Sequence, residues 1–135
     1  MAGYSGTPLP QKLGIKEQHR VLLVNAPAGF DLGTLPTGAV LVKRLAGTAL
    51  LDVIVVFVKQ REDLVAQLAA SRPRMQQAAG LWIAWPKKAS KVPTDIVEDT
   101  IREVALPTGL VDNKVCAIDD TWSGLRLVIR RENRK

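Results

Sequence analysis

The chain has 135 residues with a formal charge of +6 at pH 7. This length favours one domain, whose core buries roughly 68% of the surface exposed by the unfolded chain. The charge permits an anionic partner, because the summed charge of a protein steers its associations. Cys116 is the single cysteine and His19 the single histidine, which excludes an internal disulfide and a zinc site built from these two residue types.

The N-terminal part of the chain predicts an arm followed by two strands. Residues 1–18 are rich in Gly and Pro and show no apolar period before Leu13, so we expect an arm on the surface. They also lack a charged start followed by an apolar core, which argues against a signal peptide and favours the cytoplasm. Residues 20–24 predict a first strand that ends at Asn25, and residues 39–45 predict a second.

A buried strand and a helix follow. Residues 50–58 are a largely β-branched run that is apolar on both faces, which is typical of a central parallel strand. The run is far shorter than the roughly 20 residues of a membrane span. Residues 60–80 then change to a helical period, with acidic residues in the first turn. The period predicts an apolar face made of Leu64, Val65, Leu68 and Met75, and Pro73 predicts a kink or restart.

The second half continues this alternation of strands and helices. Residues 80–85 predict a strand, and residues 94–109 predict a helix with Thr94 as its N-cap and Gly109 at its end. Its inward face would be Ile96, Val97, Ile101, Val104 and Ala105. Residues 113–132 predict two strands joined by the turn "DDTWSG". The alternation predicts one α/β domain with a three-layer, mainly parallel sheet and an antiparallel last strand, followed by a flexible basic tail at residues 131–135.

Four separated segments carry a resemblance to a known family. The segments "TPLPQKLGIKE", "DVIVVFV", "GLWIAWPKKAS" and "DDTWSGLRLVIR" resemble, in this order, the bacterial domain-of-unknown-function family 3052. The resemblance extends over nearly the whole chain. It implies no activity, because the family has none assigned.

The second half is also similar in topology to class I S-adenosylmethionine-dependent methyltransferases, which implies a Rossmann-like fold. Such enzymes hold the cofactor with a glycine-rich loop after the first strand. Here that strand is followed by "NAPAGFDLG", which has no G-x-G pattern. Residues 25–51 are also short for the two strand-helix units expected there, so we predict an abbreviated cofactor half with no bound cofactor.

The candidate site follows from the strand ends. In open α/β sheets, ligands bind outside the carboxyl ends of the parallel strands. The residues that we expect at these ends are Asn25, Lys59, Arg61, Trp85, Lys87, Lys88, Asp119, Asp120, Thr121, Trp122 and Ser123. The lysines suit an anion, and a tryptophan in a turn must cover something, either the rim, the N-terminal arm or a partner.

Each of these features also has a purely structural interpretation. Trp82 and Trp85 lie three apart on a strand, so they face opposite sides and each can pack under a helix layer. Lys87 and Lys88 can solvate the end of a strand or pair with the two aspartates of the turn. Asp119 and Asp120 suit acid/base chemistry or a metal, yet adjacent positions in a tight turn favour a structural role.

Three functions stay open from the sequence. The first is a non-catalytic module that binds a small anion or a protein partner at the carboxyl ends of the strands. The second is a divergent S-adenosylmethionine-dependent enzyme, against which the missing glycine loop argues. The third is a nucleic-acid-binding protein, which the charge supports but the spread of basic residues along the chain does not. We expect no catalytic residue and no metal.

Overall fold

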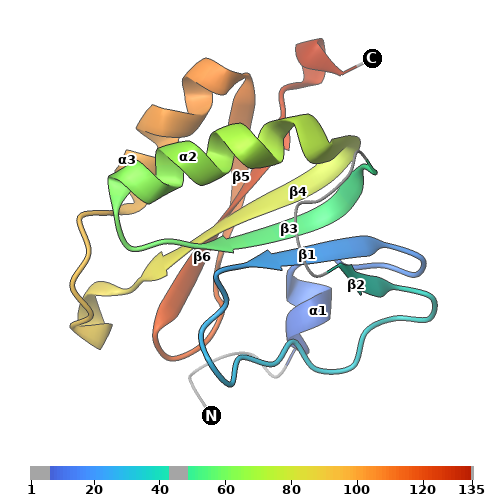
Figure 1. Cartoon of the computed structure of the whole chain (residues 1–135), viewed down its shortest axis with the longest axis horizontal. Coiled ribbons are helices and arrows are strands. Elements are labelled where there is room, and N and C mark those ends of the chain that lie inside the picture. Colours follow the sequence, from blue (N-terminus) through green and yellow to red (C-terminus); the bar gives the residue numbers. More distant parts are fainter. Residues whose placement is uncertain (1–6, 43–48, 135) are drawn as a thin grey trace.

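The computed structural model describes residues 7–42 and 49–134. The chain forms a six-stranded sheet in the order β2-β1-β3-β4-β6-β5 (Figure 1). The strands are β1 (Arg20–Val24), β2 (Val40–Val42), β3 (Leu51–Phe57), β4 (Met75–Pro86), β5 (Leu110–Ala117) and β6 (Trp122–Ile129). The helices are α1 (Leu9–Lys12), α2 (Arg61–Ser71) and α3 (Glu98–Ala105), with 3₁₀ turns η1 (Arg72–Arg74), η2 (Lys88–Ser90), η3 (Leu106–Thr108) and η4 (Arg131–Asn133).

The strand directions confirm the predicted sheet. Strands β2, β1, β3 and β4 are parallel to one another, and β6 is antiparallel to both β4 and β5. Strand β3 lies between β1 and β4, as its apolar faces predict. The second strand is shorter than predicted at its start and begins at Val40; residues 43–45 of that prediction lie outside the described residues.

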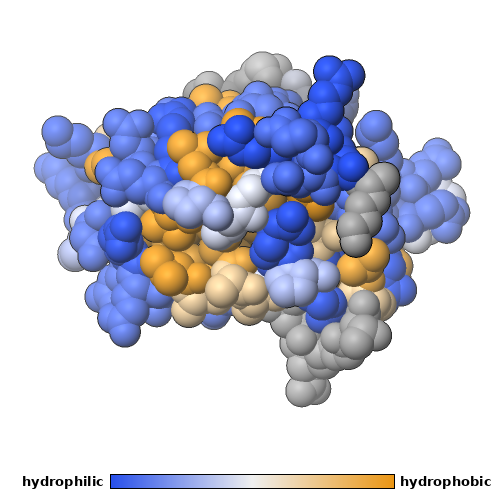
Figure 2. Space-filling model, turned by 90° about the horizontal axis from the view of Figure 1, so that it is seen from above, coloured by the Kyte–Doolittle hydropathy of each residue, from blue (hydrophilic) through white to orange (hydrophobic). Residues whose placement is uncertain are grey.

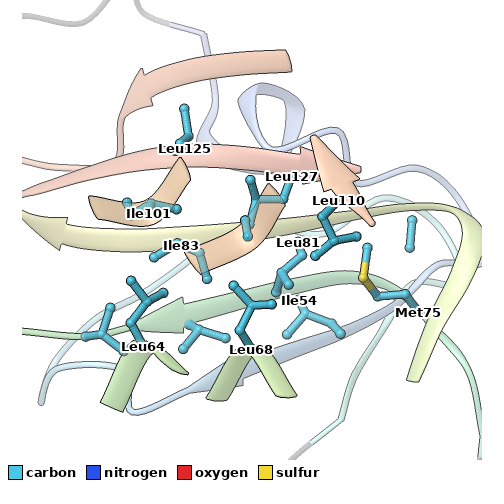
Figure 3. Packing of buried hydrophobic residues seen from close by; sticks show 14 of the residues in the cluster. Ile54, Leu64, Leu68, Met75, Leu81, Ile83, Ile101, Leu110, Leu125 and Leu127 are labelled. Carbon is cyan, nitrogen blue, oxygen red and sulfur yellow. The ribbon is translucent and has the colours of Figure 1, made fainter. Parts of the chain in front are cut away.

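Helices α2 and α3 cover one face of the sheet. Leu64 and Leu68 of α2 and Ile101 of α3 point toward strand residues such as Ile54 and Leu81 (Figure 3). The outer surface of this side is mostly hydrophilic, with apolar atoms gathered in a few places (Figure 2). The period of the two helices therefore places one apolar stripe of each helix on the sheet and leaves the opposite side in water.

Three residues assigned to the inward helix faces lie elsewhere. Val65 and Val97 are 44% and 63% exposed, so their predicted burial is wrong. Met75 is buried, but as the first residue of β4 and not as part of a helix. The helix ends at Ser71 because Pro73 lacks the N–H that would continue it. Met75 lies seven residues after Leu68, a spacing that fits the same face of a helix. One apolar residue at such a distance does not show whether the helix continues or a strand has begun, so the sequence pattern alone could not separate the two.

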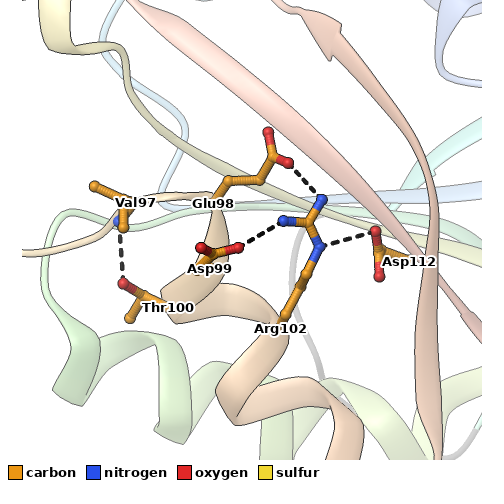
Figure 4. A network of polar contacts seen from close by, with 6 residues as sticks. All are labelled: Val97, Glu98, Asp99, Thr100, Arg102 and Asp112. Carbon is orange, nitrogen blue, oxygen red and sulfur yellow. Dashed lines mark hydrogen bonds and ion pairs between the residues drawn. The ribbon is translucent and has the colours of Figure 1, made fainter.

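The start of α3 also differs from the prediction. The helix begins at Glu98 with Val97 as its N-cap. Thr94 instead holds the preceding loop: its hydroxyl donates to the carbonyl of Lys59 at 2.5 Å and accepts from the N–H of Ile96 at 3.1 Å. The hydroxyl of Thr100 accepts from the N–H of Val97 (Figure 4). Thr94 therefore caps a turn before the helix and joins it to the end of β3.

Arg102 ties α3 to the sheet. Its guanidinium contacts Glu98 and donates to Asp99 at 2.8 Å within the helix, and its Nε donates to Asp112 of β5 at 3.1 Å (Figure 4). The hydrogen bonds to these three carboxylates raise the pKa of Arg102 far above its ordinary value. The arginine therefore stays charged and keeps α3 beside β5.

The opposite face of the sheet is covered by the short helix α1, the segment after it and the β1–β2 loop. Leu13 and Ile15, next to α1, and Leu32 of the β1–β2 loop are buried there against β-strand side chains. The indole N–H of Trp82 donates to the carbonyl of Leu13 at 3.0 Å. The predicted surface arm is therefore in part a core segment, because its few apolar residues complete a face that has no helix of its own.

A 3₁₀ turn and hydrogen bonds place the described C-terminal residues against the ends of β5 and β6, while the flexibility expected for residues 131–135 stays a prediction. Strand β5 begins at Leu110, directly after Gly109, whose φ of 86° suits a residue without a side chain. Turn η4 follows β6, and Asn133 donates to the carbonyl of Gly109 at 3.3 Å. Arg134 donates to the carbonyl of Ile129 at 3.0 Å. These contacts fold the described part of the tail back onto the ends of β5 and β6.

Candidate functional site

The order of the strands reverses between β1 and β3. From β1 the chain passes to β2 on one side, whereas β3, on the other side of β1, leads onward to β4. The carboxyl ends of β1, β3 and β4 lie at the same edge of the sheet, on the left in Figure 1. In open α/β sheets, the crevice outside the carboxyl ends at such a reversal is the usual place for a ligand.

A pocket of about 410 Å³ opens at this reversal. Its lining residues are Asn25, Pro27, Phe57, Val58, Lys59, Gln60, Asp63 and Trp122. Pockets for small molecules range from about 300 to 1,000 Å³. The rings of Phe57 and Trp122 meet edge to face with centroids 5.1 Å apart, and both side chains are buried. The pocket therefore has a rigid aromatic wall that belongs to the core of the protein.

Polar groups enter the pocket from the ends of β1 and β3. Asn25 follows β1 in the left-handed conformation, with φ of 59°, which turns the chain sharply away from the sheet. Asparagine tolerates this conformation better than most residues. Lys59 and Gln60 follow β3, and Asp63 lies in the first turn of α2. One cation, one carboxylate and two amides therefore surround the aromatic wall.

A hydrogen-bonded clasp holds the loop from Lys59 to Arg61. The carbonyl of Lys59 accepts from the hydroxyl of Thr94 at 2.5 Å and from the N–H of Asp95 at 3.2 Å. The carboxylate of Asp95 accepts in turn from the N–H of Arg61 at 2.7 Å, at the start of α2. Because the backbone is held from the β4–α3 segment, the side chains of this loop extend from a fixed base.

The structure brings Asn25, Lys59 and Trp122 of the predicted site together in this pocket. Five further residues line the pocket that the sequence pattern did not identify as site residues: Pro27, Phe57, Val58, Gln60 and Asp63. Phe57 and Val58 belong to an apolar run and read only as core residues, and Asp63 reads as a favourable charge in a first helical turn. Phe57, Val58, Gln60 and Asp63 lie at the end of the central strand or shortly after it, and this position was the signal that could have identified them.

The other predicted residues are distributed along the same edge. Trp85 and Lys88 line a separate hollow on the helix-covered side, and Asp119 lines another beside Phe30 and Asp31. The remaining five, which line none of these pockets, are Arg61, Lys87, Asp120, Thr121 and Ser123. The backbone N–H of Lys87 donates to the carbonyl of Thr121 at 2.8 Å. The predicted rim is therefore an edge with several hollows and not one site.

Asp119 of the β5–β6 turn holds the turn through its side chain. One oxygen of Asp119 accepts from the N–H groups of Thr121 and Trp122, both at 2.8 Å. Asp120 is exposed. Within the described residues, the ion pairs include none between these aspartates and Lys87 or Lys88. The turn interpretation of Asp119 is supported, and the alternative pairing with the lysines is not.

The tryptophans occupy both faces of the sheet. Trp82 and Trp85 lie in the cores on opposite faces, as their spacing predicts, although the face of Trp82 is covered by the N-terminal segment and not by a helix layer. Trp122 is 7% exposed, so it belongs to the core and leaves only a small part of its side chain accessible at the pocket.

The loop after β1 has a different construction from a dinucleotide-binding loop. Residues 25–39 contain no helix, whereas the Rossmann pattern places a helix N-terminus there against the phosphates or charged end of the ligand. Gly29 and Gly33 have φ of 80° and 89°, and a Cβ on either would meet nothing within 4 Å. These glycines therefore serve turns of the backbone and do not create a close approach to neighbouring atoms.

A comparison with family models matches residues 37–131 to the family described as "Protein of unknown function (DUF3052)". The chain belongs to this family. The match covers β2 to β6 and so includes the carboxyl ends of β3 and β4. A comparison with curated proteins finds no match.

Solved structures similar to this family member are methyltransferases and related proteins. A fibrillarin pre-rRNA processing protein of Methanococcus jannaschii has 13% identity and a TM-score of 0.62, over 85% of this chain and 68% of that one. A SAM-dependent methyltransferase of Aquifex aeolicus has 15% identity and a TM-score of 0.62, over 89% and 87%. A ribosomal protein L11 methylase of Lactobacillus delbrueckii subsp. bulgaricus has 12% identity and a TM-score of 0.59, over 90% and 74%. These likenesses show a Rossmann-like, methyltransferase-like fold. Among the described residues, the helices are too short or too polar to cross a membrane.

Proposed function

We propose that this protein binds a small anionic molecule with a planar apolar part in the pocket between β1 and β3, without catalysing a reaction. The observation that carries the proposal is the position of the pocket, which opens where the strand order reverses. Side chains from three separate segments converge there on one space of small-molecule size.

The lining supports a ligand with both apolar and charged parts. Phe57 and Trp122 supply an aromatic wall, on which a planar group packs by burying its own apolar surface. Lys59 supplies the cation for an anionic group, and the amides of Asn25 and Gln60 can donate to it. Asp63 accepts hydrogen bonds from hydroxyl or amine groups elsewhere on the ligand. The ligand that matches this lining is therefore a planar anion that also carries hydrogen-bond donors.

A divergent S-adenosylmethionine-dependent methyltransferase is the second candidate. This candidate is supported by the similarity of the fold to that of methyltransferases. Methyl transfer itself is known only for those proteins. The helix-free loop of residues 25–39 favours the first candidate, because it offers no helix N-terminus to the cofactor. Both candidates use the same pocket, so one set of binding measurements separates them.

The test is calorimetry on the whole chain with matched probes. Adenosine 5′-monophosphate carries a planar base and a phosphate, adenosine has the same base without the charge, and S-adenosylmethionine tests the second candidate. We expect the monophosphate to bind more tightly than adenosine and to weaken as salt rises, because exposed charges are screened over about 8 Å at physiological ionic strength. Lys59→Met should remove most of this salt dependence, while Lys16→Met, at an exposed lysine outside the pocket, should leave it unchanged.

Three results would overturn the proposal. Equal affinities for the monophosphate and adenosine would show that the charge is not recognised. Retention of the full salt dependence in the Lys59→Met variant would place the anion elsewhere. Micromolar affinity for S-adenosylmethionine together with methyl transfer would replace the binding module by the enzyme.

A further inference from the structure

A second hollow, of about 420 Å³, lies on the helix-covered side of the same edge. It is enclosed by the end of β4, turn η2 and the segment that leads to α3. Its lining residues are Trp85, Pro86, Lys88, Lys91, Val92, Pro93, Thr94, Ile96 and Val97. None of them lines the pocket between β1 and β3. Trp85 belongs to the core under the helices, whereas Trp122 belongs to the core on the other face.

The floor of this hollow is apolar and fixed. Trp85 and Ile96 are 8% and 1% exposed and belong to the same core cluster. The hydroxyl of Thr94 is engaged with the carbonyl of Lys59 and the N–H of Ile96, so it is already satisfied. A ligand lying on this floor therefore meets the aromatic and aliphatic surface of Trp85 and Ile96, beside a hydroxyl that already has its hydrogen-bond partners.

Val97 at the mouth extends the apolar surface outward. It is the N-cap of α3, a position where Ser, Thr, Asp or Asn stabilises a helix through a side-chain oxygen. Valine has no such oxygen, and its side chain is 63% exposed. Val97 therefore adds exposed apolar surface to the lining, which contact with an apolar ligand would remove from water.

The ionisable residues that line the hollow are both lysines. Lys88 and Lys91 are exposed on its rim. The acidic residue nearest to Lys91 in the sequence is Asp95. One of its carboxylate oxygens accepts a hydrogen bond from the N–H of Arg61 at 2.7 Å. Lys91 also has φ of 61°, a conformation that costs free energy for a residue other than glycine. Its N–H donates to the carbonyl of Lys88 at 3.2 Å, which holds the two lysines at neighbouring positions.

We propose that this hollow binds an apolar carboxylate. The hydrocarbon part lies on Trp85 and Ile96 and against Val97, and the carboxylate lies between the ammonium groups of Lys88 and Lys91. The apolar floor contributes by area removed from water, and the lysines select an anion over a neutral or cationic head group. This site is independent of the pocket between β1 and β3 and of the function proposed for it.

Matched amphiphiles test the proposal by calorimetry, with the fluorescence of the tryptophans as a second readout. Octanoate, octanol and octylamine share one hydrocarbon chain and differ in the charge of the head group. We expect octanoate to bind in a saturable way, octanol more weakly and octylamine least. A Lys88→Gln/Lys91→Gln variant should weaken octanoate about two- to thirtyfold, the range for two exposed ion pairs, and leave octanol unchanged.

The controls use residues of the same edge. Lys87→Gln removes a neighbouring lysine that does not line the hollow, and Lys59→Met removes the cation of the other pocket. Both should keep the parent affinity for octanoate, and Val97→Asp should abolish binding by placing a like charge at the mouth. The melting temperature of the Lys88→Gln/Lys91→Gln variant should match that of the parent, because Lys88 and Lys91 are exposed.

The outcomes decide the proposal. Equal binding of octanoate and octanol, an unchanged affinity in the double variant, or the absence of saturable binding in the parent would overturn it. Loss of octanoate binding in Lys59→Met alone would assign the anion to the pocket between β1 and β3. A failure of the nucleotide probes with octanoate binding intact would overturn only the function proposed for that pocket.

Discussion

The two faces of the sheet are sealed in different ways. Helices α2 and α3 cover one face, and α1, the segment after it and the β1–β2 loop cover the other. On the helix-covered face, the core is mostly Leu, Ile and Val. The other core contains Phe57, Trp82 and Trp122, with Phe30 packed against it. Large flat side chains span the gaps that irregular backbone leaves, so a loop can replace a helix layer where aromatic residues are available.

The difference also separates the two candidate ligand sites. The pocket between β1 and β3 has its aromatic wall in the loop-covered core, and the lysine-rimmed hollow has its floor in the helix-covered core. A change in one core should therefore affect one site before the other. Comparing the cores by mutation tests whether the loop-covered face is as firmly built as the helical one.

The largest expected effect comes from truncating one buried leucine on each face. Leu13 and Leu68 are both essentially inaccessible to solvent, so Leu13→Ala and Leu68→Ala should each lower the free energy of unfolding by about 2–5 kcal/mol. Urea unfolding followed by circular dichroism measures both variants. Equal losses would establish the N-terminal segment as core, whereas a loss near zero for Leu13→Ala would show that this segment is a dispensable cover.

A smaller effect is expected from adding one carbon to the loop-covered core. A Cβ at Gly124 would lie 2.8 Å from a methyl carbon of Ile118 and 3.0 Å from the ring of Trp82. Both neighbours are buried, so Gly124→Ala should cost about 1–3 kcal/mol by overpacking.

Gly80→Ala is the matched control for that change. Its Cβ would approach Arg126 at 2.6 Å, but this half-buried side chain can move toward solvent. We expect its loss of stability, measured in the same urea titration, to be the smaller of the two. The reverse order would indicate that the loop-covered core yields more easily than its packing suggests.

The smallest expected effect is a pH dependence from Cys116. Burial raises the pKa of this thiol above its ordinary value of 9.0, and the charges of Lys12 and Lys114 oppose the shift. In the unfolded chain the thiol loses its proton at lower pH than in the fold. Its contribution to stability is therefore complete below the unfolded pKa and is lost as pH rises through the folded pKa.

Comparing the parent with Cys116→Ala at one pH below and one above the ordinary thiol pKa isolates this contribution. The difference in their unfolding free energies should shift in favour of the alanine variant at the higher pH. A difference that is the same at both values would mean that the thiol is solvated as freely in the fold as in the unfolded chain.

The sequence by itself determined the central strand, the presence of both long helices and the edge at which a site must lie. Residues 50–58 are a β-branched run that is apolar on both faces, which is typical of a strand covered on both sides. Alternation of strands and helices then requires parallel neighbours, whose carboxyl ends meet at one edge. These conclusions need only local periods and chain connectivity.

Tertiary structure alone decided which of the side chains at that edge share a pocket. Asn25 and Lys59 meet Trp122, whereas Trp85 and Lys88 face another hollow on the opposite side of the sheet. It also decided that the segment around Leu13 is core. A periodic pattern reports that a residue is buried, but it does not report by what, because partners distant in the chain are set by strand order and by whichever segment covers each face.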